Sequence, residues 1–350
     1  MASKTYKDQV DQENIQKLRN LLNSMPAFCG TYFRSLEATK STRTRLSYAY
    51  DLNLFFSFLK DKNPAIAAMD LRHLPIDVLD QLSPIDIEEY LSYLQSYDKN
   101  GVTRTNKDHG ILRKLSALRS MFQYFFKKGM IQSDISARVE VPKLHTKNIV
   151  RLDPDEVATM LDLVESGEKL TPAQLRNHAK TKLRDVAIVT LLLGTGIRVS
   201  ECVGLNLTDI DFKNNKIRVV RKGGNEDIVY FSEEVAHALS DYLELDRANL
   251  QPAPGHEDAV FISLKNQRLT VRSVERLVKK YASNVTTLKK ITPHKLRSTY
   301  GTNLYRETGD IYLVADVLGH TDVNTTKKHY AAIQEDRKRS AANVVKLREP

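Results

Sequence analysis

The stretch LRDVAIVTLLLGTGIRVSE, residues 183–201, joins a long apolar run to a short charged motif. After Asp185 nearly every residue up to Leu193 is apolar, which predicts a helix that is buried on all sides in a domain core. Residues 194–201 end that helix and start another, so Arg198 and Glu201 lie three positions apart on one helical face. Taken alone, such a pair is more typical of a surface ion pair than of a functional site.

On both sides of this stretch, the second half of the chain combines helical patterns with one β pattern. Asp153 and Pro154 predict the start of a helix. The runs IRVV (217–220) and DIVYF (227–231) are β-branched and aromatic and flank a Gly-Gly pair, which predicts a β-hairpin. Residues 260–262, VFI, predict a third strand, and helical patterns resume from Thr270 to the end of the chain.

The first half of the chain shows only helical patterns. Residues 42–59 carry apolar side chains at a spacing of four, and Ser83 followed by Pro84 predicts the start of a further helix. Residues 103–128 predict one long amphipathic helix, whose apolar stripe consists of Ile111, Leu115, Leu118, Phe122 and Phe125. We find no strand pattern before residue 148, so this half is expected to form a small helical bundle.

A linker separates the two halves. Residues 142–154, PKLHTKNIVRLDP, are polar, begin and end with proline and show no periodicity. The chain has 350 residues, a length that suggests two domains. The expected fold class is therefore mostly α with two domains: an N-terminal helical bundle, and an α-rich domain with a small antiparallel β-sheet.

Composition excludes several classes of protein. The chain is 41% hydrophobic, which rules out wholesale disorder, and no apolar run approaches the length of a membrane span. The first residues, MASKTYKDQV, contain no apolar segment of the kind found in a secretory signal, so none is expected. Cys29 and Cys202 lie far apart, so neither a disulfide scaffold nor a cysteine-type zinc site is expected. We expect a cytoplasmic, nucleoid-associated protein with no membrane partner.

The chain carries a formal net charge of +10, and its basic residues are unevenly distributed. Residues 101–148 hold ten Lys and Arg against three Asp and Glu, whereas residues 51–100 hold nine acidic residues against four basic ones. This separation fits one surface that faces a polyanion and one outer surface. Charge alone leaves nucleic-acid binding and an ordinary basic surface equally open.

Three further motifs follow Arg198 in the second half. Lys222 lies at the turn of the expected hairpin, where a lysine is normally just solvated. His294 and Arg297 lie three apart near the expected start of a helix, a favourable place for a phosphate. His320 follows a Leu-Gly pair, and Tyr330 comes ten positions later. Each motif is weak when it is considered separately.

Together these residues form the inventory of a metal-free attack on a phosphodiester. The sequence lacks the clustered carboxylates with which a two-metal nuclease holds Mg²⁺, so neither a metal nor another cofactor is expected. Two guanidiniums can clamp the non-bridging phosphate oxygens. A tyrosine hydroxyl can act as the nucleophile, and Lys222 can protonate the departing sugar oxygen. The phosphotyrosine keeps the energy of the broken bond, so ATP is not needed.

The sequence resembles the tyrosine recombinase, or phage integrase, family. TGIRVSECVGLNLTDID (195–211) is similar to the first arginine box of that family, HKLRST (294–299) to its HxxR box, and LGHTDVNTTKKHY (318–330) to its His-to-Tyr box. The similarity covers residues 150–333, and KSTRTRLSYAYDLNLFFSFL (40–59) more loosely resembles the core-binding domain of the family. Ser298 stands where a histidine often follows the second arginine, and the ten-residue spacing from His320 to Tyr330 is one longer than in many relatives.

The resemblance implies a role for each matching residue. Arg198 and Arg297 would clamp the phosphate, and Lys222 would be the general acid. Glu201 would support the site without contacting the phosphate. His294 and His320 would contact the phosphate and handle protons, and Tyr330 would be the nucleophile. Tyr300, Tyr305 and Tyr312 are alternative nucleophiles, but none follows the Leu-Gly-His motif at the family spacing. We expect the DNA-binding residues of the first domain to include Arg43, Arg45, Arg104, Lys107, Arg113 and Lys114.

The resemblance also implies a domain plan. It consists of an N-terminal extension (1–24), a helical, SAM-like core-binding domain (25–141), a linker (142–154), a catalytic domain (155–333) and a tail helix (334–350). The tail helix would be exchanged between the protomers of a homotetramer on paired DNA sites.

Within the family, the sequence is most similar to the Xer recombinases, in particular to the type that acts alone, as in streptococci. The expected partner is double-stranded DNA with inverted-repeat half-sites, and the expected activity is site-specific recombination that resolves chromosome or plasmid dimers. A DNA translocase or a directionality factor remains open as a further partner. The alternatives are an integrase of a phage or conjugative transposon, a type IB topoisomerase, and a DNA-binding factor with a vestigial site.

Overall fold

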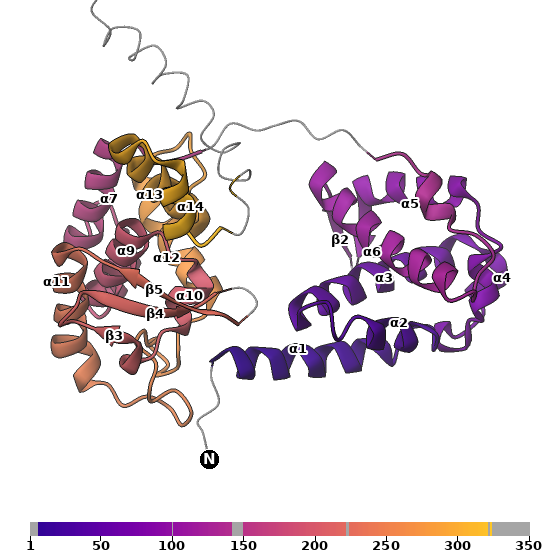
Figure 1. The fold of residues 1–350 in the computed structure, drawn as a ribbon, viewed down its shortest axis with the longest axis horizontal. Helices are drawn as coiled ribbons and strands as arrows, with labels where there is room; N and C mark the ends of the chain where they lie inside the picture. The colour runs from indigo at the N-terminus through magenta and orange to yellow at the C-terminus, as the bar shows by residue number, and fades with distance from the viewer. Residues whose placement is uncertain (1–5, 100, 142–149, 222–223, 321–322, 324–350) are drawn as a thin grey trace, which may run out of the picture. The chain divides into compact units, whose positions relative to one another are not determined.

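The computed structural model describes residues 6–99, 101–141, 150–221, 224–320 and 323, and the chain divides into two compact units, Met1–Lys147 and Asn148–Pro350 (Figure 1). Both units are mainly helical, and the second contains a small antiparallel sheet. The expected fold class is therefore confirmed. Among the described residues, no helix is long and apolar enough to cross a membrane.

The first unit is a helical bundle with one β-hairpin. Its helices and strands are α1 (Tyr6–Leu22), α2 (Cys29–Ser35), α3 (Thr42–Lys62), α4 (Pro64–Ala67), α5 (Pro84–Gln95), β1 (Ser96–Lys99), β2 (Val102–Thr105) and α6 (Asp108–Lys127). Three short 3-10 helices cover Leu71–His73, Ile76–Leu79 and Ile135–Arg138. The Ser41 hydroxyl accepts from the backbone N–H of Thr44 and so caps the start of α3. The whole predicted apolar stripe of α6 is buried in the core.

The hairpin of β1 and β2 contradicts two predictions, namely that no strand precedes residue 148 and that a helix begins at residue 103. The strands pair antiparallel, with Ser96 opposite Thr105 and Lys99 opposite Val102, and the helix begins only at Asp108. Two signals in the sequence explain the difference. Three of the four residues of β2 are β-branched, and Asn-Gly at 100–101 is the strongest dipeptide signal for a two-residue hairpin turn. Gly101 has a φ of 72°, as such a turn requires.

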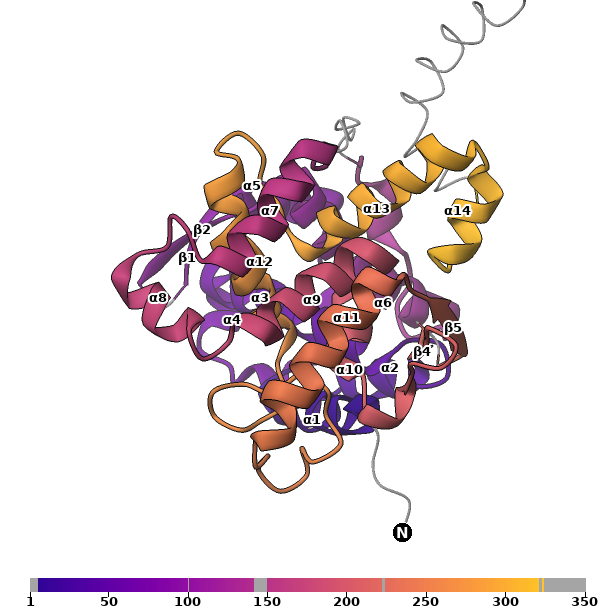
Figure 2. The same ribbon diagram turned by 90° about the vertical axis from the view of Figure 1, so that its left-hand side faces the viewer.

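The second unit is built around α9. Its helices and strands are α7 (Pro154–Ser166), α8 (Pro172–His178), α9 (Lys182–Thr195), α10 (Val199–Gly204), β3 (Ile210–Asp211), β4 (Lys216–Val220), β5 (Glu226–Tyr230), α11 (Glu233–Asp241), α12 (Val271–Val285), α13 (Pro293–Thr308) and α14 (Ile311–Val317). Short 3-10 helices cover Leu207–Asp209 and Arg247–Asn249, and a π-helical turn covers Tyr242–Asp246. Helix α9 packs against α7, α11 and α13, which confirms the predicted buried helix (Figure 2).

The small sheet has the order β3-β4-β5, so the predicted hairpin is confirmed, but the third strand is not residues 260–262. Those three residues are buried outside the sheet. Their backbone makes only isolated pairings: Ile262 forms a single β-bridge with Arg268, and the Val260 N–H donates to the Leu205 carbonyl. Side chains bind two of their carbonyls, since the Tyr242 hydroxyl donates to that of Val260 and Arg184 to that of Ile262. A short apolar run can be a buried connection as well as a strand, and its periodicity does not separate the two.

The end of the predicted linker is fixed to the second unit. Leu152 is fully buried, and its N–H donates to the Thr299 hydroxyl on α13 at 3.0 Å. Lys289, in the connection before α13, donates to the carboxylate of Asp153 at 2.8 Å. Residues 142–149 of the linker lie outside the described residues.

Candidate active site

The first arginine motif connects α9 to α10. Gly196 ends α9 with a φ of 64°, and Arg198 is the residue immediately before α10. The carboxylate of Glu201 accepts from the backbone N–H of Arg198 and from its guanidinium Nη1, both at 2.7 Å. The Glu201 side chain is only 2% exposed and that of Arg198 is 33% exposed. The pair is therefore not a surface ion pair, since a buried carboxylate holds a guanidinium that still reaches solvent.

The second arginine motif lies in the first turns of α13, and its two members have different surroundings. His294, the second residue of the helix, is exposed, whereas Arg297 is 4% exposed. Arg297 donates from Nη1 to the carbonyl of Gly196 at 2.7 Å and from Nη2 to the carbonyl of Leu318. This arginine thus joins the end of α9 to the end of α14.

Helix α14 ends at the Leu-Gly-His motif, where Gly319 adopts a φ of 60°. The N–H groups of Gly319 and His320 donate to carbonyls of the last helical turn, those of Asp316 at 2.7 Å and Ala315 at 2.9 Å. This turn leaves the last carbonyls of the helix open to side-chain donors. His320 is partly buried directly beyond it.

Three arginines meet at this helix end. Arg221 donates to the Val317 carbonyl at 3.1 Å, Arg297 to that of Leu318, and Arg198 to that of Gly319 at 3.2 Å. We call Arg198, Arg221, Arg297 and these three carbonyls the arginine cluster. The C-terminal end of a helix carries partial negative charge, which favours guanidinium groups there.

Arg221 is the member that the sequence did not single out, although it directly precedes Lys222. Its Nε donates to the carboxylate of Asp227 on β5 at 2.9 Å, and its Nη1 to that of Glu201 at 3.2 Å. The only signal in the sequence is an arginine at the end of a strand, beside a turn. That position is usually solvated, so its burial could not be predicted.

Lys222, Tyr330 and the tail 334–350 lie outside the described residues, so their roles stay predictions. The three alternative nucleophiles, Tyr300, Tyr305 and Tyr312, lie within the described residues. Burial raises the pKa of Tyr300, which disfavours the phenolate that a nucleophile needs. Tyr305 is buried, and Tyr312 is 63% exposed on α14.

The six basic residues predicted to bind DNA differ in exposure. Arg43, Arg104, Lys107 and Arg113 are exposed, and Arg113 donates two hydrogen bonds to Asp51. Arg45 and Lys114 are buried, which does not fit direct contact with DNA. Arg45 donates to Glu37 at 3.1 Å, and Lys114 donates to the side-chain oxygen of Asn106 at 2.8 Å. Burial lowers the pKa of Lys114.

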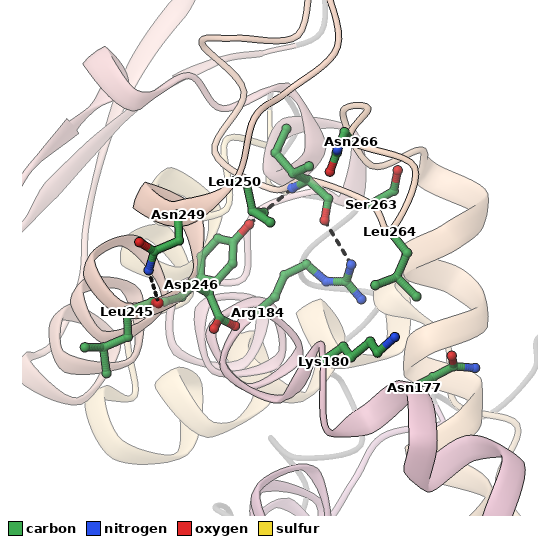
Figure 3. A pocket seen from close by; sticks show the side chains of 12 residues that line it. Asn177, Lys180, Arg184, Leu245, Asp246, Asn249, Leu250, Ser263, Leu264 and Asn266 are labelled. Carbon is green, nitrogen blue, oxygen red and sulfur yellow. Dashed lines mark hydrogen bonds between the residues drawn. The ribbon is translucent and has the colours of Figure 1, made fainter.

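A separate cavity of about 470 Å³ lies between the start of α9, the π-helical turn and the loop 262–266 (Figure 3). Arg184 and Lys180 border it, together with Asp246 and several amide side chains. None of its lining residues belongs to the arginine cluster. Within the described part of the chain, no group of three or more His, Cys, Asp or Glu side chains is arranged to hold a metal ion.

Comparisons with known proteins identify the family. The model of the phage integrase family matches residues 150–337, more than half of the chain. The chain is 32% identical over 323 residues to the tyrosine recombinase XerC of Caldanaerobacter subterraneus subsp. tengcongensis, covering 89% of this chain and 84% of that protein. It is 31% identical over 356 residues to the tyrosine recombinase XerS of Lactococcus lactis subsp. cremoris, covering 93% and 96%.

Two solved structures show the same fold. The XerH site-specific recombinase bound to its palindromic difH substrate has a TM-score of 0.65 at 19% identity, covering 91% of this chain and 85% of that one. The Tn1549 transposon integrase in complex with circular intermediate DNA has a TM-score of 0.60 at 21% identity, covering 88% and 95%.

The chain therefore belongs to the phage integrase family. It is a tyrosine-type site-specific DNA recombinase, and its similarity to Xer tyrosine recombinases extends over most of its length. The expected resemblance to the single Xer recombinases of streptococci is confirmed by 30% identity over 357 residues to XerS of Streptococcus pneumoniae.

Proposed function

We propose that this recombinase cleaves and rejoins duplex DNA through a 3′-phosphotyrosyl intermediate and acts in the resolution of chromosome or plasmid dimers. The observation that carries this proposal is the arginine cluster, in which Arg198 and Arg297 come from segments 99 positions apart and are held on one helix end. Similarity to XerC and XerS over most of the chain supports the dimer-resolution role rather than mobile-element integration.

In the proposed cleavage step, the hydroxyl oxygen of Tyr330 attacks the scissile phosphorus and the bond from phosphorus to the 5′ oxygen breaks. The proton of the tyrosine leaves to an imidazole of the site, and Lys222 donates a proton to the departing 5′ oxygen. Arg198, with its partly exposed guanidinium, and Arg297 neutralise the charge on the non-bridging oxygens. His294 and His320 contact the same phosphate. Religation is the reverse of this step.

The proposed partner is double-stranded DNA with inverted-repeat half-sites, on which four protomers assemble and exchange their C-terminal tails. In support, XerH and the Tn1549 integrase were solved as complexes with DNA. The exposed Arg43, Arg104 and Lys107 are available for phosphate contacts. A protein with this role works in the cytoplasm on the nucleoid, and a DNA translocase or directionality factor would set when it acts.

Covalent trapping on fragmented host DNA tests the proposal. Wild type and Tyr330→Phe are incubated with the fragments and quenched with SDS, and the protein-linked DNA is recovered and sequenced. We expect linked DNA with wild type alone, concentrated at one short inverted-repeat site opposite the replication origin. Tyr330→Phe should bind that site with unchanged affinity, because the substitution removes only the hydroxyl.

Other outcomes contradict specific parts of the proposal. A site at the ends of a mobile element would replace dimer resolution with integration, and adducts scattered over the fragments would indicate a topoisomerase. The absence of any adduct, even on nicked DNA that blocks religation, would leave a DNA-binding factor. Deletion of 334–350 should impair recombination between two sites more than binding of one half-site, and unchanged recombination would refute tail exchange.

A further inference from the structure

Arg221 occupies a position that links the β-hairpin to the rest of the arginine cluster. Its backbone closes the hairpin loop, because its N–H donates to the carbonyl of Asn225 at 2.7 Å and its own carbonyl accepts from Gly224 at 3.0 Å. Its side chain, which is 10% exposed, bonds to Asp227 on the partner strand. The base of the loop is therefore held by both the backbone and the side chain of one residue.

The same guanidinium reaches out of the hairpin to two other elements. It donates to Glu201, whose carboxylate also orients Arg198, and to the carbonyls of Val317 and Leu318 at the end of α14. It also lies close to Gly319 in the turn that follows. A Cβ on Gly319 would come within 2.8 Å of Nε and Cζ of Arg221, so a larger residue at 319 would force this side chain to shift, in addition to straining the backbone φ of 60°.

A second arginine of the hairpin, Arg218 on β4, shows that such bonding is not general for the hairpin. Arg218 also forms two ion pairs, with Asp209 and Glu226, but its side chain is 46% exposed. Neither Asp209 nor Glu226 belongs to the arginine cluster. Arg218 therefore provides a matched comparison for the loss of a paired arginine from this hairpin.

We propose that Arg221 is a positioning residue for DNA cleavage: it fixes the start of the hairpin loop, and through it Lys222, against the carboxylate that orients Arg198. The inference rests on the proposed function, since it assigns Lys222 the role of general acid. Lys222 follows Arg221 directly in the chain, so a fixed Arg221 limits where the lysine amino group can reach.

This proposal makes a chemical prediction that a purely structural role does not make. A general acid is needed because the 5′ alkoxide is a poor leaving group. When sulfur replaces the bridging 5′ oxygen, the leaving group is a thiolate, whose conjugate acid has a pKa of about 8.5, so no proton donor is required. A defect caused by a misplaced Lys222 should therefore disappear on the sulfur substrate, whereas a defect in the phosphate clamp should persist.

The test uses a nicked duplex of the site recovered by covalent trapping, made with either oxygen or sulfur at the bridging 5′ position. The rate of adduct formation is measured for wild type, Arg221→Gln, Arg221→Lys and Arg218→Gln, with Lys222→Ala and Arg198→Ala as references. We expect Arg221→Gln to be slowed about 100-fold on the oxygen substrate and to come within about fivefold of wild type on the sulfur substrate. The rate of Arg221→Lys on the oxygen substrate should be intermediate, because an ammonium cannot reproduce the several directed hydrogen bonds of a planar guanidinium.

Several results would overturn the inference. If Arg221→Gln formed adducts on the sulfur substrate as slowly as Arg198→Ala does, its effect would lie on the arginines that clamp the phosphate. If Arg221→Gln were no slower than wild type on the oxygen substrate, Arg221 would have no role in cleavage. An equal loss in Arg218→Gln would indicate general damage to the hairpin. Wild type that cleaves neither substrate would instead refute the proposed function itself.

A second variant keeps the test decisive if Arg221→Gln does not fold, which thermal melting would reveal. Asp227→Asn removes the charge of a partner that is 43% exposed while leaving the bonds from Arg221 to Glu201 in place. It should show a smaller loss on oxygen, about tenfold, with the same recovery on sulfur. A loss that persists on sulfur in a folded Asp227→Asn protein would count against the proposal.

Discussion

The guanidinium of Arg297 donates to the carbonyl oxygen of Gly196 at 2.7 Å, although the two residues are 101 positions apart. The contact joins the first arginine motif to the second through a main-chain atom, and Arg297 continues from there to the end of α14. The site thus depends on backbone placed by glycines as much as on the arginines themselves.

Gly196→Ala should therefore damage both stability and activity. The φ of 64° is strained for alanine, and the new Cβ would lie 2.5 Å from a ring carbon of Tyr300. Strain of this kind costs about 1–3 kcal/mol, and a displaced Arg297 should lower the cleavage rate by about 10²-fold. Chemical denaturation and adduct formation measure the two effects. Gly255→Ala, with a φ of 83° and open space around it, should show the strain alone and keep activity.

The two members of the HxxR motif should respond differently to substitution. Arg297→Lys leaves a buried carbonyl without its donor, at a cost of about 1–3 kcal/mol, in addition to slowing cleavage. The exposed His294→Ala should change unfolding by no more than about 0.5 kcal/mol while still slowing cleavage. Equal destabilisation by both variants would show that exposure is a poor guide to their roles.

Glu201→Gln should slow cleavage with little change in DNA affinity. The substitution keeps one acceptor but removes the charge that Arg198 and Arg221 share. Misplacement of Arg198 relative to the phosphate should cost about 10²-fold in adduct formation. Glu226→Gln, which removes the charge of an exposed partner of Arg218, is the matched control and should behave as wild type.

Substitutions of exposed and of buried basic residues in the first unit should have different effects on the salt dependence of DNA affinity. Arg43→Ala, Arg104→Ala and Lys107→Ala should each weaken binding and lower the slope of log affinity against log salt by about 1. Lys114→Met should leave that slope unchanged and reduce stability, because the amino group is buried against Asn106. A changed slope for Lys114→Met would show instead that Lys114 contacts a phosphate of the DNA.

The ion pair between Asp153 and Lys289 should stabilise the protein over a defined pH range. The hydrogen bond from Lys289 lowers the pKa of Asp153, so its contribution is complete above the ordinary carboxyl pKa and is lost as pH falls through the lower folded value. The same bond raises the pKa of Lys289, whose contribution is lost only as pH rises through that raised value. Asp153→Asn should therefore cost about 1 kcal/mol or less at pH 7.

Thermal melting across this pH range checks the prediction. Asparagine caps helices about as well as aspartate, so this substitution isolates the charge. The difference from wild type should vanish on acidification. Asp155→Asn removes a charge from the same helical turn and serves as the control.

The sequence predicted those parts of the fold that have a strong periodicity or a complete local signature. The apolar run after Asp185 predicted α9, and Ser83 with Pro84 predicted α5, since each signal is contained within one element. Residues 260–262 failed, because a buried connection and a strand need the same apolar side chains. The hairpin at 96–105 failed because the polar residues around Asn-Gly at 100–101 gave no alternation of apolar and polar positions.

For the site, the sequence predicted which residues matter but not how they are held. Arg198, His294, Arg297 and His320 are recognisable from motif spacing. The three carbonyls at the end of α14 are backbone atoms, and no side-chain pattern encodes them. Arg221 was overlooked because burial of a charge next to a turn depends on partners at Glu201 and Asp227 that only the folded chain brings together.

A carboxylate shared by two arginines also constrains how this sequence can change over time. Loss of Glu201 removes a partner from Arg198 and Arg221 at once, and loss of either arginine leaves the other facing a changed charge. The effects of substitutions at these positions should therefore depend strongly on one another rather than add. A lineage that replaces one of the three residues is expected to carry compensating replacements at the others, so substitutions at the three positions should be correlated among related sequences.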